Sequence, residues 1–391
     1  MLDHIFWSGP LVAGLLTWLA LRLLQPVASR LDLLDHPKGR KDHAHPTPIT
    51  GGIAMALGMM AAGLMTLTSV GTTFFGFIAA ASLLVVVGLL DDKYDLRWWI
   101  RVLAQVMAAL IMVYVGDVRI NELGAAFGFP GMELGALSVP FTVFATVGLI
   151  NAVNMVDGID GLAGTLVLGA LVMFSMAALY SGNTMIGERA MVLAGAVVAF
   201  LWYNLRTPWR PKAALFMGNA GSAFLGFAIA WIAFRLTQSP SHPVNPALAL
   251  WLLPIPVMDC LVLLVRRVGQ RKSPFSADRD HIHHLMLDAG FTPSLICATL
   301  LVFSGLCGLA AAQAMRLDVP HPVIIGAFVL MCVAWYWVTL RRERALSFLR
   351  FVRERGFFGT PLPWSLARPV PSADARANAR TNEGTGVRDI R

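Results

Sequence analysis

Long apolar segments alternate with short polar ones along most of the chain. About eleven of them have the roughly 20 consecutive apolar residues that a helix needs to cross the hydrocarbon core of a bilayer. The windows are residues 5–24, 51–69, 72–90, 98–115, 138–153, 162–180, 189–205, 220–237, 247–266, 292–313 and 321–340. The pattern predicts an all-α polytopic membrane protein with a membrane domain over residues 1–340.

Composition agrees with this prediction. The chain is 57% hydrophobic and only 14% charged, whereas about a quarter of the residues of a soluble domain are charged. Its four cysteines all fall inside apolar windows and form no CxxC spacing, so we expect free thiols and neither a disulfide nor a zinc site. The first window has no basic region before it, and we expect a retained helix there.

Lys and Arg residues are distributed unequally between alternate loops. Basic residues are retained in cytoplasmic loops, and an N-terminus outside leaves all but four of the 31 on the cytoplasmic side. The four outer residues are Arg119, Arg189, Arg235 and Arg316. We therefore predict that the N-terminus is outside and the C-terminus cytoplasmic. The net charge of +8 reflects this orientation and attraction to anionic membrane lipids, so no nucleic-acid partner is expected.

The segment NAVNMVDGIDGLAG places two carboxylates between two predicted spans. Asp157 and Asp160 are costly there unless they face water, a cation or a polar ligand. Asn151 and Asn154 add amide donors and acceptors beside them. The alternative explanation is a polar turn between two helices.

A second acidic cluster, DDKYDL, ends the third window. On a continuing helix Asp91 and Asp95 share one face, and Asp92 lies beside them. Such carboxylate clusters suit magnesium, which is often shared with substrate phosphates. The alternative is a solvated helix end whose acids are neutralised by basic neighbours such as Arg101.

Two other cytoplasmic segments carry groups suited to phosphate. Lys41 lies in a basic loop that could hold phosphate, although retention of positive charge inside explains this loop equally well. The segment FMGNAGS opens a span with small polar residues, among them Asn219. A helix N-terminus with free amides favours an anion.

The ninth window and the loop after it complete the candidate chemistry. Two prolines, Pro254 and Pro256, predict a broken or kinked helix. Asp259 follows them, and we interpret it as an ion-pair partner of Arg266 or Arg267.

The loop then contains Arg279 and a histidine cluster of His281, His283 and His284. Zinc needs three or four converging ligands, and no cysteine lies close in sequence. Imidazoles and an arginine are equally suited to a diphosphate. Because all these groups lie at one interface rather than near mid-membrane, an enzyme with a cytosolic substrate is favoured over a transporter.

The motifs DDKYDL, NAVNMVDGIDGLAG, FMGNAGS and SPFSADRDHIHH, in this order, resemble those of the bacterial polyprenyl-phosphate N-acetylhexosamine-1-phosphate transferases, which form glycosyltransferase family 4. The resemblance covers roughly residues 1–340. The HIHH form is similar to the WecA branch, whereas the MraY branch usually carries three consecutive histidines, a run that Ile282 interrupts here.

The resemblance implies a multi-pass enzyme of the bacterial inner membrane, with a periplasmic N-terminus and a cytoplasmic active site. It would transfer an N-acetylhexosamine-1-phosphate, chiefly GlcNAc-1-phosphate, from the UDP-sugar to undecaprenyl phosphate and release UMP. This step would prime the synthesis of O-antigen or related cell-surface polysaccharides. A homodimer is compatible with this assignment.

The resemblance also implies residue roles. Asp91 matches the proposed base that takes the proton of the lipid phosphate. The other catalytic candidates are Asp92, Asp157, Asp160 and His281. Substrate contacts would come from Lys41, Asn151, Asn154, Arg279, His283 and His284. Magnesium, with manganese as the alternative ion, would be held by Asp92, Asp160 and Asn219.

Asn219 departs from the family pattern, in which an aspartate that binds magnesium follows FMG. An amide oxygen still coordinates magnesium but carries no charge, so we expect weaker metal binding and reduced turnover. The competing hypotheses are an MraY-type phospho-MurNAc-pentapeptide transferase, a membrane transporter, and a lipid-phosphate binding protein that has lost its chemistry.

The tail, residues 341–391, is basic. Its first part alternates Arg with Leu, Phe and Val, a pattern typical of a helix on the membrane surface. Its last twenty or so residues lack aromatic side chains and are predicted to be disordered.

Overall fold

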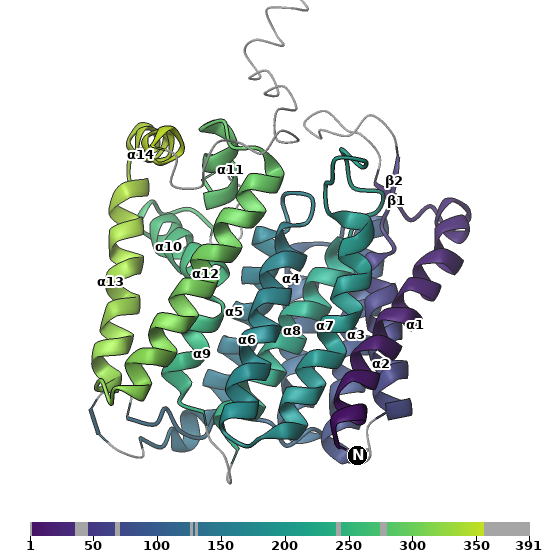
Figure 1. The fold of residues 1–391 in the computed structure, drawn as a ribbon, viewed down its shortest axis with the longest axis horizontal. Coiled ribbons are helices and arrows are strands. Elements are labelled where there is room, and N and C mark those ends of the chain that lie inside the picture. The colour runs from purple at the N-terminus through teal and green to yellow at the C-terminus, as the bar shows by residue number, and fades with distance from the viewer. Residues whose placement is uncertain are drawn as a thin grey trace, which may run out of the picture.

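The computed structural model describes residues 2–35, 46–66, 71–125, 128–129, 132–239, 244–273 and 280–355. These ranges form a helical bundle with its long helices roughly side by side (Figure 1). The helices are α1 (Leu2–Arg30), α2 (Gly51–Thr66), α3 (Thr72–Tyr94), α4 (Trp98–Tyr114), α5 (Ser138–Val156), α6 (Leu162–Tyr180), α7 (Thr184–Asn204), α8 (Gly218–Thr237), α9 (Pro246–Leu252), α10 (Pro254–Gly269), α11 (Ile282–Asp288), α12 (Pro293–Arg316), α13 (His321–Thr339) and α14 (Arg342–Glu354).

The predicted class of an all-α polytopic membrane protein is confirmed. Eight helices of the described ranges are long and apolar enough to cross a membrane, or nine if the bent pair α9–α10 forms one span. The helices α2 and α4 lie on two further predicted windows but are shorter, with 16 and 17 residues. The count of eleven spans stays a prediction.

Three short elements were not predicted as such. A two-stranded antiparallel sheet pairs β1 (Leu34–Asp35) with β2 (Thr47–Pro48), and Gly135–Leu137 forms a short 3-10 helix before α5. The sheet lies at the same end of the bundle as α11 and α14, opposite the N-terminus (Figure 1).

The helix α8 lies at the centre of the bundle, packed against α2, α3 and α5. Glycines allow these close contacts. A Cβ atom added to Gly88 of α3 would lie 2.4 Å from the Cα atom of Ala220, and one added to Gly226 would lie 2.6 Å from the Cα atom of Ile150. Trp231 of α8 fills the space beside Phe77, with ring centroids 5.1 Å apart.

The predicted break in the ninth window is confirmed. The axes of α9 and α10 differ by 91°. Pro254 opens α10 and has no backbone N–H to continue the hydrogen bonding of α9. As a result α10 crosses the bundle and packs against α5 and α13.

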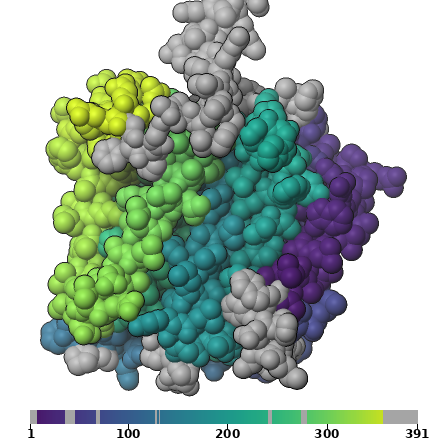
Figure 2. Space-filling model, in the orientation of Figure 1, coloured from purple at the N-terminus to yellow at the C-terminus, as the bar shows by residue number. Residues whose placement is uncertain are grey.

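The buried apolar side chains form two clusters. The first lies mainly among α1 to α8 and also includes residues of α9 and α12. The second contains residues of the five helices from α10 through α14, together with residues at the beginning of α6. In the space-filling view the green and yellow surface of α12 to α14 lies beside the teal surface of α6 and α7 (Figure 2).

Candidate active site

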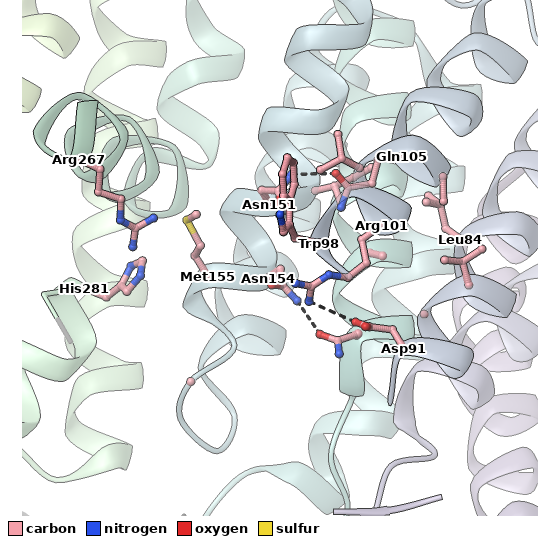
Figure 3. Close-up of a pocket in the computed structure, with 18 of the residues that line it drawn as sticks. Leu84, Asp91, Trp98, Arg101, Gln105, Asn151, Asn154, Met155, Arg267 and His281 are labelled. Atoms are coloured by element: carbon pink, nitrogen blue, oxygen red, sulfur yellow. Dashed lines mark hydrogen bonds and ion pairs between the residues drawn. The ribbon is translucent and has the colours of Figure 1, made fainter. Parts of the chain in front are cut away.

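A pocket of about 300 Å³ lies between the two clusters and is lined by α3, α4, α5, α8, α10 and α11 (Figure 3). Between α3 and α4 its walls are apolar, with Leu84, Val87 and Val102. The rest of the lining includes the apolar Ile150, Met155 and Ala223 but is mainly polar. The polar residues are Asp91, Arg101, Gln105, Asn151, Asn154, Asn219, Arg267, His281, His283 and His284.

Asp91 is 3% exposed and lies where the apolar walls meet the polar ones. Its carboxylate accepts a hydrogen bond from the backbone N–H of Leu96 at 2.9 Å and pairs with Arg101 Nη1 at 3.3 Å. Arg101 therefore does neutralise one acid of the DDKYDL cluster, as the alternative explanation of that cluster predicted. Both partners point toward the pocket, so the pair belongs to the site as well (Figure 3).

Asp92 caps the N-terminus of α8. Its two carboxylate oxygens accept the backbone N–H groups of Asn219 at 2.8 Å and Ala220 at 3.3 Å. Negative charge is stabilised at this end of a helix. Gly218 makes the contact possible, because a Cβ there would lie 2.5 Å from Asp92 Oδ2 and its φ is +72°.

The Asn219 side chain belongs to a polar network around Asn154. Asn154 Nδ2 donates to Asn219 Oδ1 at 3.2 Å and to Ser222 Oγ at 2.8 Å. Asn151 Nδ2 donates to Gln105 Oε1 at 2.8 Å. Gln105 was missed in the sequence analysis; its signal was a lone polar residue within the fourth apolar window.

Asp160 is held by a basic partner outside the pocket lining. Its Oδ2 atom accepts from Arg206 Nε at 2.7 Å and from the backbone N–H of Ala213 at 3.1 Å. These bonds tie the loop before α6 to the loop before α8. Asp160 therefore has a structural partner in addition to its predicted catalytic role.

Asp157 lies in the loop between α5 and α6, and within the described ranges its carboxylate accepts no hydrogen bond. Burial, followed by the charges of Asp92 and Asp160, raises the pKa of Asp157 to about 7. Asp157 thus lies close enough to both of these carboxylates to be repelled by them. A cation would relieve that repulsion.

His281 is oriented by Asp259, which corrects the predicted pairing of this carboxylate with Arg266 or Arg267. Asp259 Oδ2 lies 2.8 Å from His281 Nδ1, and Oδ1 accepts the backbone N–H of Ile282 at 3.1 Å. Arg266 instead reaches Asp280. The prediction failed because α10 turns its Asp259 face toward α11.

His283 is 1% exposed, and neither of its ring nitrogens has a hydrogen-bond partner in the described structure. Burial, then the neighbouring His284 and His281, keep the pKa of His283 well below its usual range. The ring approaches Gly158 so closely that a Cβ there would lie 2.4 Å from Nε2. This contact explains the first glycine of the DGIDG segment.

Of the predicted substrate residues, Lys41 and Arg279 lie outside the described residues. Three of the predicted catalytic residues, Asp92, Asp157 and Asp160, do not line the pocket, although Asp91 and Gly158, the chain neighbours of the first two, do. Arg267 was missed: it is 3% exposed and lies beside His281 on the pocket wall (Figure 3). Arg267 is one of two adjacent arginines at the end of an apolar window, and such a pair is ordinarily interpreted as a signal of membrane topology rather than of a binding site.

Comparison with known proteins agrees with the arrangement of the motifs. The model of the family described as glycosyl transferase family 4 matches residues 74–237, from α3 to the end of α8. That segment contains Asn219 and the four aspartates with predicted catalytic roles, but not the histidine cluster. The aspartates are Asp91, Asp92, Asp157 and Asp160.

Curated relatives match over a longer range, and all three described here carry the name undecaprenyl-phosphate alpha-N-acetylglucosaminyl 1-phosphate transferase. The protein of Yersinia pestis is 34% identical over 330 residues, which cover 84% of this chain and 90% of the relative. That of Haemophilus influenzae is 33% identical, covering 82% and 91%, and that of Escherichia coli (strain K12) is 33% identical, covering 87% and 93%. The chain therefore belongs to glycosyl transferase family 4.

Proposed function

We propose that the protein transfers GlcNAc-1-phosphate from UDP-GlcNAc to undecaprenyl phosphate and releases UMP. The names of the relatives support this reaction. The observation that carries it is the position of Asp91, at the junction of an apolar groove and a polar pocket. One end of that pocket suits a polyprenyl chain and the other a nucleotide diphosphate.

In this reaction an oxygen of the lipid phosphate forms a bond to the β-phosphorus of the UDP-sugar, and the bond between that phosphorus and the bridging oxygen breaks. UMP leaves with the bridging oxygen. Asp91 would accept the proton of the lipid phosphate. Arg101, which now pairs with Asp91, would place its charge on that phosphate.

The polar side of the pocket would hold the UDP-sugar. Arg267 and His281 are buried and lie side by side, which suits them to the diphosphate. Asp259 fixes the orientation of the His281 ring. His283, whose pKa is low, would contact the substrate as a neutral imidazole. Asn151 and Asn154 would orient the nucleotide.

Magnesium is the proposed cofactor, and the residues present fit it. Among the described residues, no three His, Cys, Asp or Glu side chains form a preassembled metal site. Magnesium, however, commonly needs only one or two carboxylates together with substrate phosphates. Asp157, Asp160 and Asn219 would supply the oxygen donors. Both carboxylate oxygens of Asp92 accept backbone N–H groups of α8, so Asp92 would act indirectly, by holding the end of the helix that carries Asn219. The ion would neutralise charge on the transferred phosphoryl group.

We further propose that the protein spans the bacterial inner membrane about eleven times, with the pocket on the cytoplasmic face. The excess of Lys and Arg in the loops at that end supports this orientation. The product would prime O-antigen or a related surface polysaccharide.

The test is UMP release by the purified protein given undecaprenyl phosphate, magnesium and UDP-GlcNAc. We expect release that stops without magnesium and falls at least about 100-fold in Asp91→Asn, because the base is lost. Asn219→Asp should raise turnover at low magnesium by restoring a charged ligand. Parallel reactions with UDP-MurNAc-pentapeptide test the MraY-type alternative. No release with either sugar donor would overturn the proposal.

A further inference from the structure

The helix α11, which carries His283 and His284, has only seven residues. Isolated helices of this length are unstable in water, so neighbouring elements must hold α11 in place. Asp259 of α10 binds its first backbone N–H, that of Ile282. Among the described residues, α14 also makes polar contacts at both ends of α11, and it lies in the tail to which the sequence analysis assigned no site residue.

Two arginines of α14 reach the C-terminal end of α11. Arg342 Nη2 donates to Asp288, the last residue of α11. Arg353 Nη1 donates to the carbonyl oxygen of Ala289 at 2.9 Å. Gly290 permits this approach, because a Cβ there would lie 2.0 Å from Arg353 Nη1.

The same Arg342 also reaches the other end of α11. Its Nη1 atom donates to Asp280 Oδ1 at 2.7 Å, one residue before His281. The second oxygen of Asp280 accepts from Arg266 Nη2 at 2.5 Å, and Arg266 also donates to the carbonyl oxygen of Thr339, the last residue of α13. Asp280 is thus held by α10 and α14 together.

Apolar contacts join the same two helices. Ala345 and Leu349 of α14 are 0% and 6% exposed and belong to the second hydrophobic cluster, which also contains Leu285 and Met286 of α11. On its other face, α14 exposes Phe348 and Phe351. The buried face therefore packs where α11 needs support.

We propose that α14 is a positioning element of the active site, and that Arg342 and Arg353 hold the histidine helix α11 at both ends. This proposal rests on the proposed function, in which the histidines contact the UDP-sugar. Each exposed ion pair alone contributes little. Because these contacts hold a helix of only two turns that carries the histidines, their loss should reduce catalysis more than it reduces the stability of the whole protein.

The test compares the double variant Arg342→Gln/Arg353→Gln with Arg344→Gln in the full chain. Arg344 is a matched control on the same helix, because it donates to the carbonyl oxygen of Trp337 and stacks on that ring at 4.1 Å, toward α13. Amide hydrogen exchange is measured over residues 281–290, and UMP release gives kcat and KM.

In the double variant we expect exchange over residues 281–290 to rise at least about tenfold and kcat to fall about tenfold. KM for undecaprenyl phosphate, whose groove lies between α3 and α4, should stay within twofold. Arg344→Gln should match the unchanged chain. Arg342→Lys with Arg353→Lys should restore only part of the protection and turnover, because one ammonium group does not replace the two guanidinium nitrogens that reach Asp280 and Asp288.

Two results would overturn the proposal: exchange equal to that of Arg344→Gln, or raised exchange with unchanged kcat. If the unchanged chain releases no UMP, the proposed function fails, and the exchange comparison still decides whether α14 holds α11. A thermal midpoint within a few degrees of the unchanged chain excludes general unfolding as the cause.

Discussion

Two carboxylates of the site differ in what balances their charge. Asp92 accepts two backbone N–H groups at the positive end of α8. Asp157 accepts none within the described ranges and lies near the charges of Asp92 and Asp160. Without a cation, ionised Asp157 is therefore a source of instability in the folded protein, as well as a candidate ligand.

This difference predicts a pH-dependent stability. The pKa of Asp157 rises from 3.8 to about 7 on folding, so the folded state binds more protons than the unfolded state between these values. Its protonated form favours folding at low pH, and this contribution is lost as the pH rises through 7. Asp157→Asn should thus raise the free energy of unfolding by about 1–3 kcal/mol at pH 8, and by much less at pH 5.

Thermal unfolding in detergent without magnesium measures this effect, and added magnesium should reduce the gain at pH 8. Asp95→Asn is the control, because Asp95 is an exposed carboxylate of the other acidic cluster, DDKYDL. A gain for Asp157→Asn that is equal at both pH values would contradict the assignment.

At the scale of elements, the position of α8 depends on small residues in its neighbours. We predict that Gly88→Ala destabilises the protein by about 2 kcal/mol or more, because its Cβ would meet the backbone of α8 at 2.4 Å. Gly148→Ala in α5 is the matched control, since a Cβ there meets nothing within 4 Å. That variant should gain up to about 1 kcal/mol from helix propensity.

Thermal midpoints of both variants, measured in one detergent, check the prediction. Gly88→Ala should also reduce UMP release, because α8 carries Asn219 and receives Asp92 at its N-terminus. Equal midpoints would mean that α3 and α8 can separate without cost.

The helices were predictable because the apolar windows alone determine them, and Pro254 marks the break in the ninth. Helix ends were less so: the first window ends at residue 24, whereas α1 continues to Arg30. The residues from 25 to 30 include Gln25, Ser29 and Arg30, so hydropathy gives no signal that the helix continues there. The β1–β2 pair has only two residues in each strand, too few for a recognisable alternation.

The site residues were predictable as motifs, but their partners were not. Asp92 and Asn219 are far apart in sequence, and only helix packing brings them together. Asp259 has two arginines nearby in sequence, yet it pairs with His281 because α10 bends away from α9. Gln105 and Arg267 belong to no motif and become part of the site only through the fold.

At the scale of the whole molecule, the lining of the pocket joins helices of the first hydrophobic cluster to α10 and α11 of the second. The end of the bundle that carries α11 lies opposite the N-terminus (Figure 1). The proposed orientation places that end in the cytoplasm. Alkaline phosphatase fused after Gly182, in the loop between α6 and α7, should be active in whole cells, because alkaline phosphatase folds only outside the cytoplasm. A fusion after Lys272, in the loop after α10, should be inactive.

Fusions of a fluorescent protein at the same two positions provide the control and should show the reverse pattern. Phosphatase activity after Lys272 together with none after Gly182 would invert the topology and put the pocket on the outer face.

The separation into two clusters also has a consequence for biosynthesis. The helices up to α8 carry Asp91, Asp157 and Asn219, whereas the histidines and the arginines that hold them come from α11 and α14. A nascent chain inserts the first group into the bilayer well before the ribosome has made the second. Unfinished chains thus acquire the lipid groove without the histidines, and a chain terminated before α11 would lack the side chains proposed to contact the UDP-sugar.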